Sequence, residues 1–211
     1  MTPPAPELLY AVNPMCSWCY GFAPSLAALR DARGPSLRIT LALGALRAET
    51  EAMRPEQKAH LTSAWQRVGQ ASGQPFDPAL LQVDDFAYDT RPASRAVMAA
   101  RSLGEAAALD LLAAIQQAFY RDARRVTRTD VLRDVADEIG LDGAAIVAAA
   151  EDPAAATALE RENRDVAALG IEGYPTVVAL GPPARVVTVG FLPPAALLDR
   201  VDAVLGPVRG S

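Results

Sequence analysis

The chain contains only two cysteines, Cys16 and Cys19, and two residues separate them. They follow an apolar run at 8–12, which has the length and content of a buried strand, and they precede a segment that takes up helical spacing. A thiol pair between a strand and a helix is typical of a thiol–disulfide active site. The spacing fits one helical turn, so Cys19 can resolve a mixed disulfide formed at Cys16. Free N–H groups at the helix N-terminus favour the thiolate, so we expect Cys16 to be the more exposed and more acidic thiol.

Two structural roles compete with a redox role for this pair. Cysteine is often simply a small buried residue. A structural zinc site needs four ligands, normally Cys or His, and the chain adds only one histidine, His60, to its two cysteines. We therefore expect no metal site within one chain, and we expect redox chemistry at the pair.

Composition and charge limit the classes of partner that the chain can bind. The net charge of −5 and the lack of a basic cluster larger than 121–125 argue against a nucleic-acid partner. Residues 1–7 lack the basic and apolar regions of a secretory signal, and no apolar stretch approaches the roughly 18 residues that span a membrane. We expect a cytoplasmic protein without a membrane partner, in which a catalytic disulfide is more common than a structural one.

The order of elements predicts the fold class. Strands at 8–12 and 37–43 flank a helix from Cys19 to about Arg33, which is typical of a parallel βαβ unit. The pattern from about 47 to 168 is helical, and a predicted antiparallel hairpin and a last helix follow it. This order indicates an α/β, thioredoxin-like fold with a large all-helical insertion: 1–48 and 168–211 form the thioredoxin-like domain, and 49–167 form the insertion. The helices expected before the hairpin are 56–72, 92–103, 105–120, one that starts after 127–130 and ends at Gly140, and one from Asp152 to Gly170; the hairpin strands are 176–180 and 186–191, and the last helix follows Pro193-Pro194.

Three segments resemble the DsbA-like branch of the thioredoxin superfamily, and especially the cytoplasmic FrnE-like predicted disulfide isomerases. The strongest is Asn13–Pro24, which contains Cys16-Ser17-Trp18-Cys19. The second is Gly170–Val177, which is similar to the family's loop that ends in a cis-proline, and the weakest is Asp89–Ala96. The resemblance covers essentially the whole chain.

The resemblance implies that Pro175 is the cis-proline beside the cysteines and that Tyr174 offers backbone groups to a substrate strand. Trp18 is then either a substrate contact or a cover for the disulfide. The best-known oxidases of this branch have Pro-His between the cysteines, whereas this chain has Ser17-Trp18. Without that histidine we expect a less oxidising couple, and the direction of net electron flow stays open.

The leading hypothesis for function is a thiol–disulfide oxidoreductase or isomerase that acts on protein or small-molecule disulfides. We expect no tightly bound cofactor, and glutathione is a candidate redox partner; the oligomeric state is not predicted. Two alternatives stay open. One is a glutathione-dependent enzyme of the kappa-class transferase or hydroxychromene carboxylate isomerase type, which generally has serine where Cys16 stands. The other is a redox-responsive interaction module without turnover.

Other chemically suggestive residues favour structural roles. His60 is expected on a polar helix face, and Asp84-Asp85 in a loop or helix cap. No glycine-rich phosphate loop is present. The remaining aromatic residues of the helical segment are expected to form its core: Trp65, Phe76, Phe86, Phe119 and Tyr120.

Overall fold

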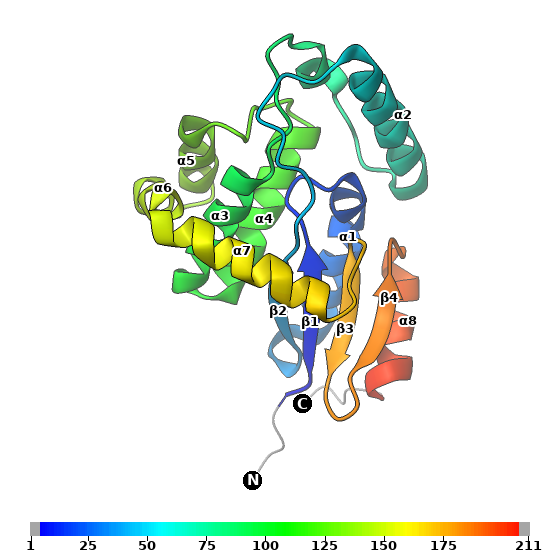
Figure 1. Ribbon diagram of the computed structural model, residues 1–211. Helices are drawn as coiled ribbons and strands as arrows, with labels where there is room; N and C mark the ends of the chain where they lie inside the picture. Colours follow the sequence, from blue (N-terminus) through cyan, green and yellow to red (C-terminus); the bar gives the residue numbers. More distant parts are fainter. Residues whose placement is uncertain (1–4, 207–211) are drawn as a thin grey trace.

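A mixed sheet of four strands organises the computed structural model, which describes residues 5–206 (Figure 1). The strands are β1 (Glu7–Val12), β2 (Arg38–Leu43), β3 (Thr176–Leu180) and β4 (Arg185–Val189), in the spatial order β2-β1-β3-β4. β1 runs parallel to β2 and antiparallel to β3, and β3 runs antiparallel to β4. The predicted βαβ unit and C-terminal hairpin are therefore confirmed.

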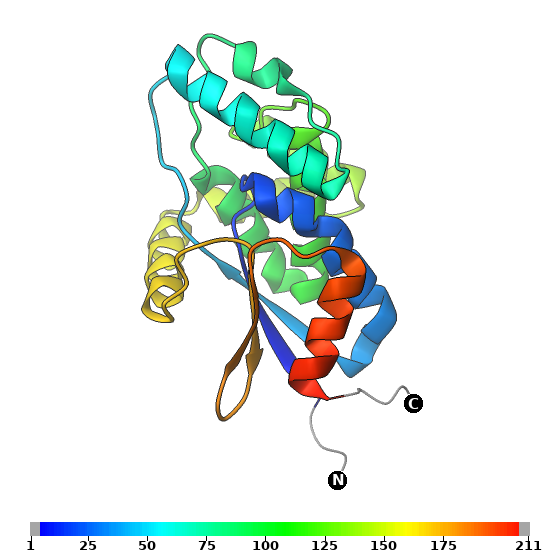
Figure 2. The same cartoon turned by 90° about the vertical axis from the view of Figure 1, so that its right-hand side faces the viewer.

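Different helices cover the two faces of this sheet (Figure 2). They are α1 (Ser17–Arg33) and α8 (Pro194–Leu205) on one face, and α7 (Pro153–Ala168) on the other. Successive side chains of β1 point to opposite faces. Leu8 and Tyr10 enter the main core with α1, whereas Ala11 joins a small cluster with Val166 of α7. The main core therefore lies on the α1 face.

The segment between β2 and β3 is helical, as predicted, and it contains six α-helices. Besides α7 these are α2 (Pro55–Ser72), α3 (Arg91–Ala100), α4 (Glu105–Tyr120), α5 (Thr129–Glu138) and α6 (Gly143–Glu151). The described residues also form three 3₁₀ turns, η1 (Gly34–Ser36), η2 (Pro78–Gln82) and η3 (Arg101–Leu103). Within residues 5–206, no helix is both long enough and apolar enough to cross a lipid bilayer.

Several details of the predicted elements were wrong. The helix expected at 92–103 ends at Ala100 and continues as η3. The strand expected to reach 191 ends at Val189, because Gly190 has a φ of +87° and leaves the extended conformation. Helix α6 was not predicted as a separate element; its start is marked by Asp142, whose side chain accepts a hydrogen bond from the Ala145 N–H at 2.9 Å.

The helical segment packs directly on the first helix of the sheet domain. A Cβ at Gly21 of α1 would lie 2.8 Å from Cγ1 of Val68 in α2, so the two helices approach too closely for a larger side chain. Beside this contact, Tyr20 of α1 stacks on Tyr120 of α4, with ring centroids 5.0 Å apart. The predicted aromatic core is confirmed: Trp65, Phe86, Phe119 and Tyr120 are buried, and Phe76 is half-buried against them.

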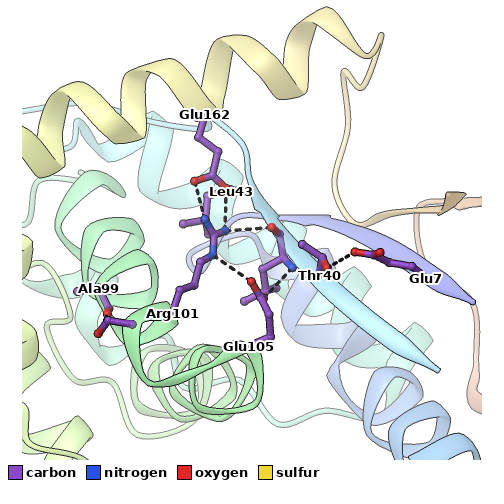
Figure 3. A network of polar contacts seen from close by, with 9 residues as sticks. Glu7, Thr40, Leu43, Ala99, Arg101, Glu105 and Glu162 are labelled. Carbon is purple, nitrogen blue, oxygen red and sulfur yellow. Dashed lines mark hydrogen bonds and ion pairs between the residues drawn. The ribbon is translucent and has the colours of Figure 1, made fainter. Parts of the chain in front are cut away.

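The helical segment also closes the outer edge of β2 with charged side chains (Figure 3). Glu105 of α4 accepts a hydrogen bond from the Leu41 N–H at 3.1 Å, and Glu162 of α7 accepts one from the Leu43 N–H at 2.7 Å. Arg101 donates twice to Glu162, at 2.7 Å each, and once to the Leu41 carbonyl at 3.1 Å. The outer edge of an edge strand exposes backbone N–H and C=O groups that can pair with other chains. These side chains form hydrogen bonds with such groups of β2 and link α7 to the sheet.

Candidate active site

Both cysteines lie where strand β1 passes into helix α1. Cys16 is the N-cap residue of α1, in an extended conformation with φ −92° and ψ 118°. The helix therefore begins at Ser17, two residues earlier than predicted, and Cys19 lies within its first turn. Cys16 is 7% exposed and Cys19 is completely buried, which agrees with the expected order of exposure. Both are free thiols.

The two thiols have opposite pKa shifts. Hydrogen bonding from the Cys19 thiol lowers the pKa of Cys16, and the backbone N–H groups of Cys19 and Trp18 lower it further, although burial opposes them. Burial raises the pKa of Cys19 well above its ordinary value, and the adjacent Cys16 raises it further. The helix N-terminus and the second thiol thus together favour a thiolate at Cys16.

The loop between α7 and β3 brings Tyr174 and Pro175 to the cysteines. The Tyr174–Pro175 peptide bond is cis, as the resemblance implied. The Cys16 thiol donates a hydrogen bond to the Tyr174 carbonyl, with Sγ and O 3.6 Å apart. The Tyr174 ring lies over Gly44, where an added Cβ would be 1.9 Å from its Oη. A glycine after β2 therefore makes room for the side chain that precedes Pro175.

Trp18 forms a surface next to the cysteines. It is 38% exposed, and its ring centroid lies 6.1 Å from that of Phe191, which is half-buried after β4. Val189, at the end of β4, is 70% exposed. The exposed Trp18 ring, packed near the half-buried Phe191, offers apolar contact area to a bound peptide.

A buried polar residue that the sequence did not single out, Asn13, holds the turn that precedes Cys16. Its carbonyl accepts from the Cys16 N–H at 3.1 Å, and its side-chain oxygen accepts from the Met15 N–H at 3.0 Å. Its amide group donates to the Gly44 carbonyl at 2.9 Å and to the Thr90 hydroxyl at 3.3 Å. Asn13 and Thr90 lie in two of the segments that resemble the family, and this resemblance was the one sequence feature that could have pointed to them.

A second buried hydroxyl, that of Tyr88, acts on the same turn. It donates to the Met15 carbonyl at 2.6 Å and lies 3.2 Å from the Tyr120 hydroxyl. Burial raises the pKa of Tyr88 above its ordinary value, so the phenol stays protonated and keeps donating. No sequence signal near Tyr88 pointed to this role, because its partner is 73 positions away.

The remaining candidates lie away from the cysteines. His60 is exposed on α2, as expected. Asp84 and Asp85 are exposed, and Asp85 pairs with Arg125 at 3.1 Å. The described part of the chain contains no group of three or more His, Cys, Asp or Glu residues able to hold a metal ion.

Comparison with known proteins identifies the family. Residues 13–202 match the DSBA-like thioredoxin domain. The chain belongs to this family. A crystal structure of a Nitrosomonas europaea protein, provisionally described as a protein disulfide isomerase, is 30% identical, with a TM-score of 0.86 over 96% of this chain and 98% of that one. The cytosolic disulfide reductase DsbM of Pseudomonas aeruginosa, solved with GSH, is 29% identical, with a TM-score of 0.77 over 94% and 98% of the two chains.

More distant relatives have other descriptions. The ClpXP adapter protein SpxH of Shouchella clausii is 26% identical over 82% of this chain, and the chain spans 57% of that relative's length. A 2-hydroxychromene-2-carboxylate isomerase shares the fold at 17% identity, with a TM-score of 0.66 over 95% and 94% of the two chains. The family and the disulfide-active neighbours together support an oxidoreductase or an isomerase.

Proposed function

We propose that the chain is a thiol–disulfide oxidoreductase that exchanges disulfides through Cys16 and Cys19. The inequality of the two thiols supports this most directly. Cys16 is the more exposed and has a lowered pKa, whereas Cys19 is fully buried and has a raised pKa. An attacking thiol has to be ionised and reachable by substrate, whereas a resolving thiol acts only inside the protein.

In the reducing direction the reaction has two exchange steps. The Cys16 thiolate attacks one sulfur of a substrate disulfide, the substrate S–S bond breaks, and the departing substrate thiolate takes a proton from solvent. Cys19 then loses its proton and attacks Cys16, which releases the second substrate thiol and leaves a Cys16–Cys19 disulfide. The substrate gains two electrons and the protein loses two. Two molecules of a small thiol, for which we propose glutathione, restore the dithiol and leave as their disulfide.

The residues around the pair suit a bound peptide. We propose that the backbone of Tyr174, next to Pro175, aligns the substrate chain by main-chain hydrogen bonds, as in strand addition. Trp18 would contact substrate side chains, since it is partly exposed and adjacent to the nucleophile. Removal of its ring would then weaken peptide binding more than it weakens the fold.

The couple is proposed to act as a reductase or isomerase in the cytosol. Ser17 and Trp18 stand between the cysteines, so no histidine is available there to stabilise the Cys16 thiolate further. A less stabilised thiolate makes the disulfide less oxidising. The cytosolic location is proposed from the DsbM neighbour, which is described as a cytosolic disulfide reductase.

Trapping of the mixed disulfide tests the proposal. Cys19→Ser should still attack a peptide disulfide through Cys16 and should accumulate the covalent mixed disulfide, detectable by intact mass. Cys16→Ser, which changes the neighbouring thiol in the same way, should form none and should not reduce insulin. Equal adduct formation by the two variants, or insulin reduction by Cys16→Ser, would refute the assignment.

A second candidate is a redox-responsive adapter that binds a protein without turnover. The relatives described as ClpXP adapter proteins favour it, at 22–26% identity over 81–82% of this chain. A protein partner that binds only one redox form of the chain, with no insulin reduction by the wild type, would support this candidate over the first.

A further inference from the structure

A cavity of about 140 Å³ lies beside the turn that leads to Cys16. Its walls come from that turn and the loop after β2, from the start of α3, and from α7. The lining residues that matter here are Asn13, Gly44, Arg91, Ser94 and Asn163. The cavity is therefore built jointly by the sheet and by the helical segment.

One polar group in this cavity lacks a protein partner. The Oδ1 atom of Asn163 is buried and has no hydrogen-bond partner within residues 5–206. Ser94, which is only 2% exposed, adds a hydroxyl to the same wall. A buried polar atom costs free energy when it is unpaired. An asparagine amide can turn to present either its donor or its acceptor, and a hydroxyl can do both, so Asn163 and Ser94 can serve a polar ligand.

The cavity also has an excess of hydrogen-bond donors. Arg91 uses Nε and Nη2 on Asp89, at 2.8 Å each, which leaves Nη1 available. Arg47 uses only Nη1, on Glu49 at 2.9 Å. The N-cap side chain of α3, Thr90, donates to the Arg47 carbonyl rather than capping its own helix. At the start of α3 the Arg91 backbone N–H already donates to Asp89 at 3.0 Å, so the guanidinium groups of Arg91 and Arg47 are what favour an anionic ligand, despite the neighbouring carboxylates of Asp89 and Glu49.

The cavity is close enough to Cys16 to belong to its substrate site. Asn13 lines it, and the hydrogen bond from the Cys16 N–H to the Asn13 carbonyl closes a four-residue turn. The Cα atoms at the ends of such a turn lie within about 7 Å of each other. On the other side Gly44 supports the Tyr174 ring, and the Tyr174 carbonyl accepts from the Cys16 thiol.

We infer that this cavity binds the carboxylate of a small thiol or disulfide substrate in which the carboxylate follows the reacting cysteine by one residue, as in glutathione. A carboxylate in that position lies within roughly two residue lengths, about 7 Å, of the substrate cysteine. The volume admits a carboxylate. The inference rests on the proposed function, because it takes Cys16 as the reacting thiol.

Binding of an unreactive analogue tests the cavity separately from redox turnover. S-methylglutathione has this carboxylate, whereas its glycyl ethyl ester has an uncharged ester there, and neither can exchange disulfides. Titration followed by NMR should give the wild type about tenfold tighter binding of the acid than of the ester. Arg91→Gln should remove most of this preference, and Ser94→Ala should lower it about threefold.

Two matched variants control for general effects of these changes. Arg133 also pairs with a neighbouring aspartate, Asp134, and Ser102 is an exposed serine of η3; both lie outside the cavity. Arg133→Gln and Ser102→Ala should keep the full preference, and circular dichroism should show folded protein in all four variants. Equal affinity of the wild type for acid and ester, or an undiminished preference in both cavity variants, would overturn the inference. Exchange of the wild type with dithiothreitol, which has no carboxylate, reports on the proposed function alone.

Discussion

The hydroxyl of Tyr88 should stabilise the fold far more than the hydroxyl of Tyr120, although the two are in contact. Tyr88 has one proton, and the short bond to the Met15 carbonyl at 2.6 Å uses it. Tyr120 must therefore be the donor in the 3.2 Å contact between the hydroxyls. Both rings are buried, so water cannot replace a lost partner.

Replacement of each tyrosine by phenylalanine gives unequal losses. Tyr88→Phe leaves two buried groups unpaired, the Met15 carbonyl and the Tyr120 hydroxyl, and each costs about 1–3 kcal/mol. Tyr120→Phe leaves no donor unpaired and removes one ordinary hydrogen bond, which costs about 1 kcal/mol. We expect Tyr88→Phe to lower the free energy of unfolding by about 2–6 kcal/mol and Tm by roughly 4–24 °C, and Tyr120→Phe to lower Tm by about 3 °C.

Urea unfolding and thermal scans of both variants and of the double variant measure these quantities. In the double variant the Tyr120 hydroxyl no longer exists, so its unpaired cost disappears. The double variant should be no less stable than Tyr88→Phe alone. Tyr120→Phe as destabilised as Tyr88→Phe, or fully additive losses in the double variant, would refute the assigned direction of these hydrogen bonds.

Three further outcomes follow from the structure. The rate of alkylation of Cys16 should level off at a pH below about 8.5, because its pKa is lowered and the thiolate is the reactive form, whereas Cys19 should react only at higher pH; mass spectrometry that found Cys19 the faster thiol would contradict this. Glu162→Gln should lower the free energy of unfolding in urea by about 2 kcal/mol, because Arg101 loses the carboxylate that accepts two of its hydrogen bonds and keeps as an ion pair the longer, 3.9 Å contact with Glu105, whereas Glu138→Gln, at an exposed ion pair, should cost less than about 1 kcal/mol. Trp18→Ala should raise KM for a peptide disulfide about tenfold and leave Tm nearly unchanged, and an equal rise for a small disulfide without a peptide would argue against a peptide contact.

The predictable part of the site was encoded locally. The strand, the cysteine spacing and the start of a helix lie within 8–33, and their order indicated which thiol would be the more exposed. The loop before β3 could be associated with the cysteines only through the resemblance, because about 155 residues separate Pro175 from them. Local periodicity also missed α6, since its alanine-rich sequence lacks a contrast between apolar and polar faces.

The groups that shape the cysteine turn could not be predicted, because they depend on packing between distant segments. Tyr88 lies in a short connection between η2 and α3, where sequence patterns carry little information. Ser94 and Asn163 occur in ordinary helical contexts, and only the packing of α3 and α7 places them in one cavity. In a single sequence, a polar residue that is buried in a helix cannot be told apart from one on the surface of that helix.

The turn at 13–16 explains why the helical segment is part of the site. Within the turn, Asn13 satisfies the N–H groups of Met15 and Cys16. The Met15 carbonyl and one contact of the Asn13 amide depend instead on Tyr88 and Thr90, which the helical segment contributes. Without these partners, polar groups next to the nucleophile would be left unpaired at about 1–3 kcal/mol each. The part predicted as thioredoxin-like, 1–48 with 168–211, therefore lacks groups that fix the position of Cys16. The conformation of the turn at 13–16 depends on how the helical segment packs against it.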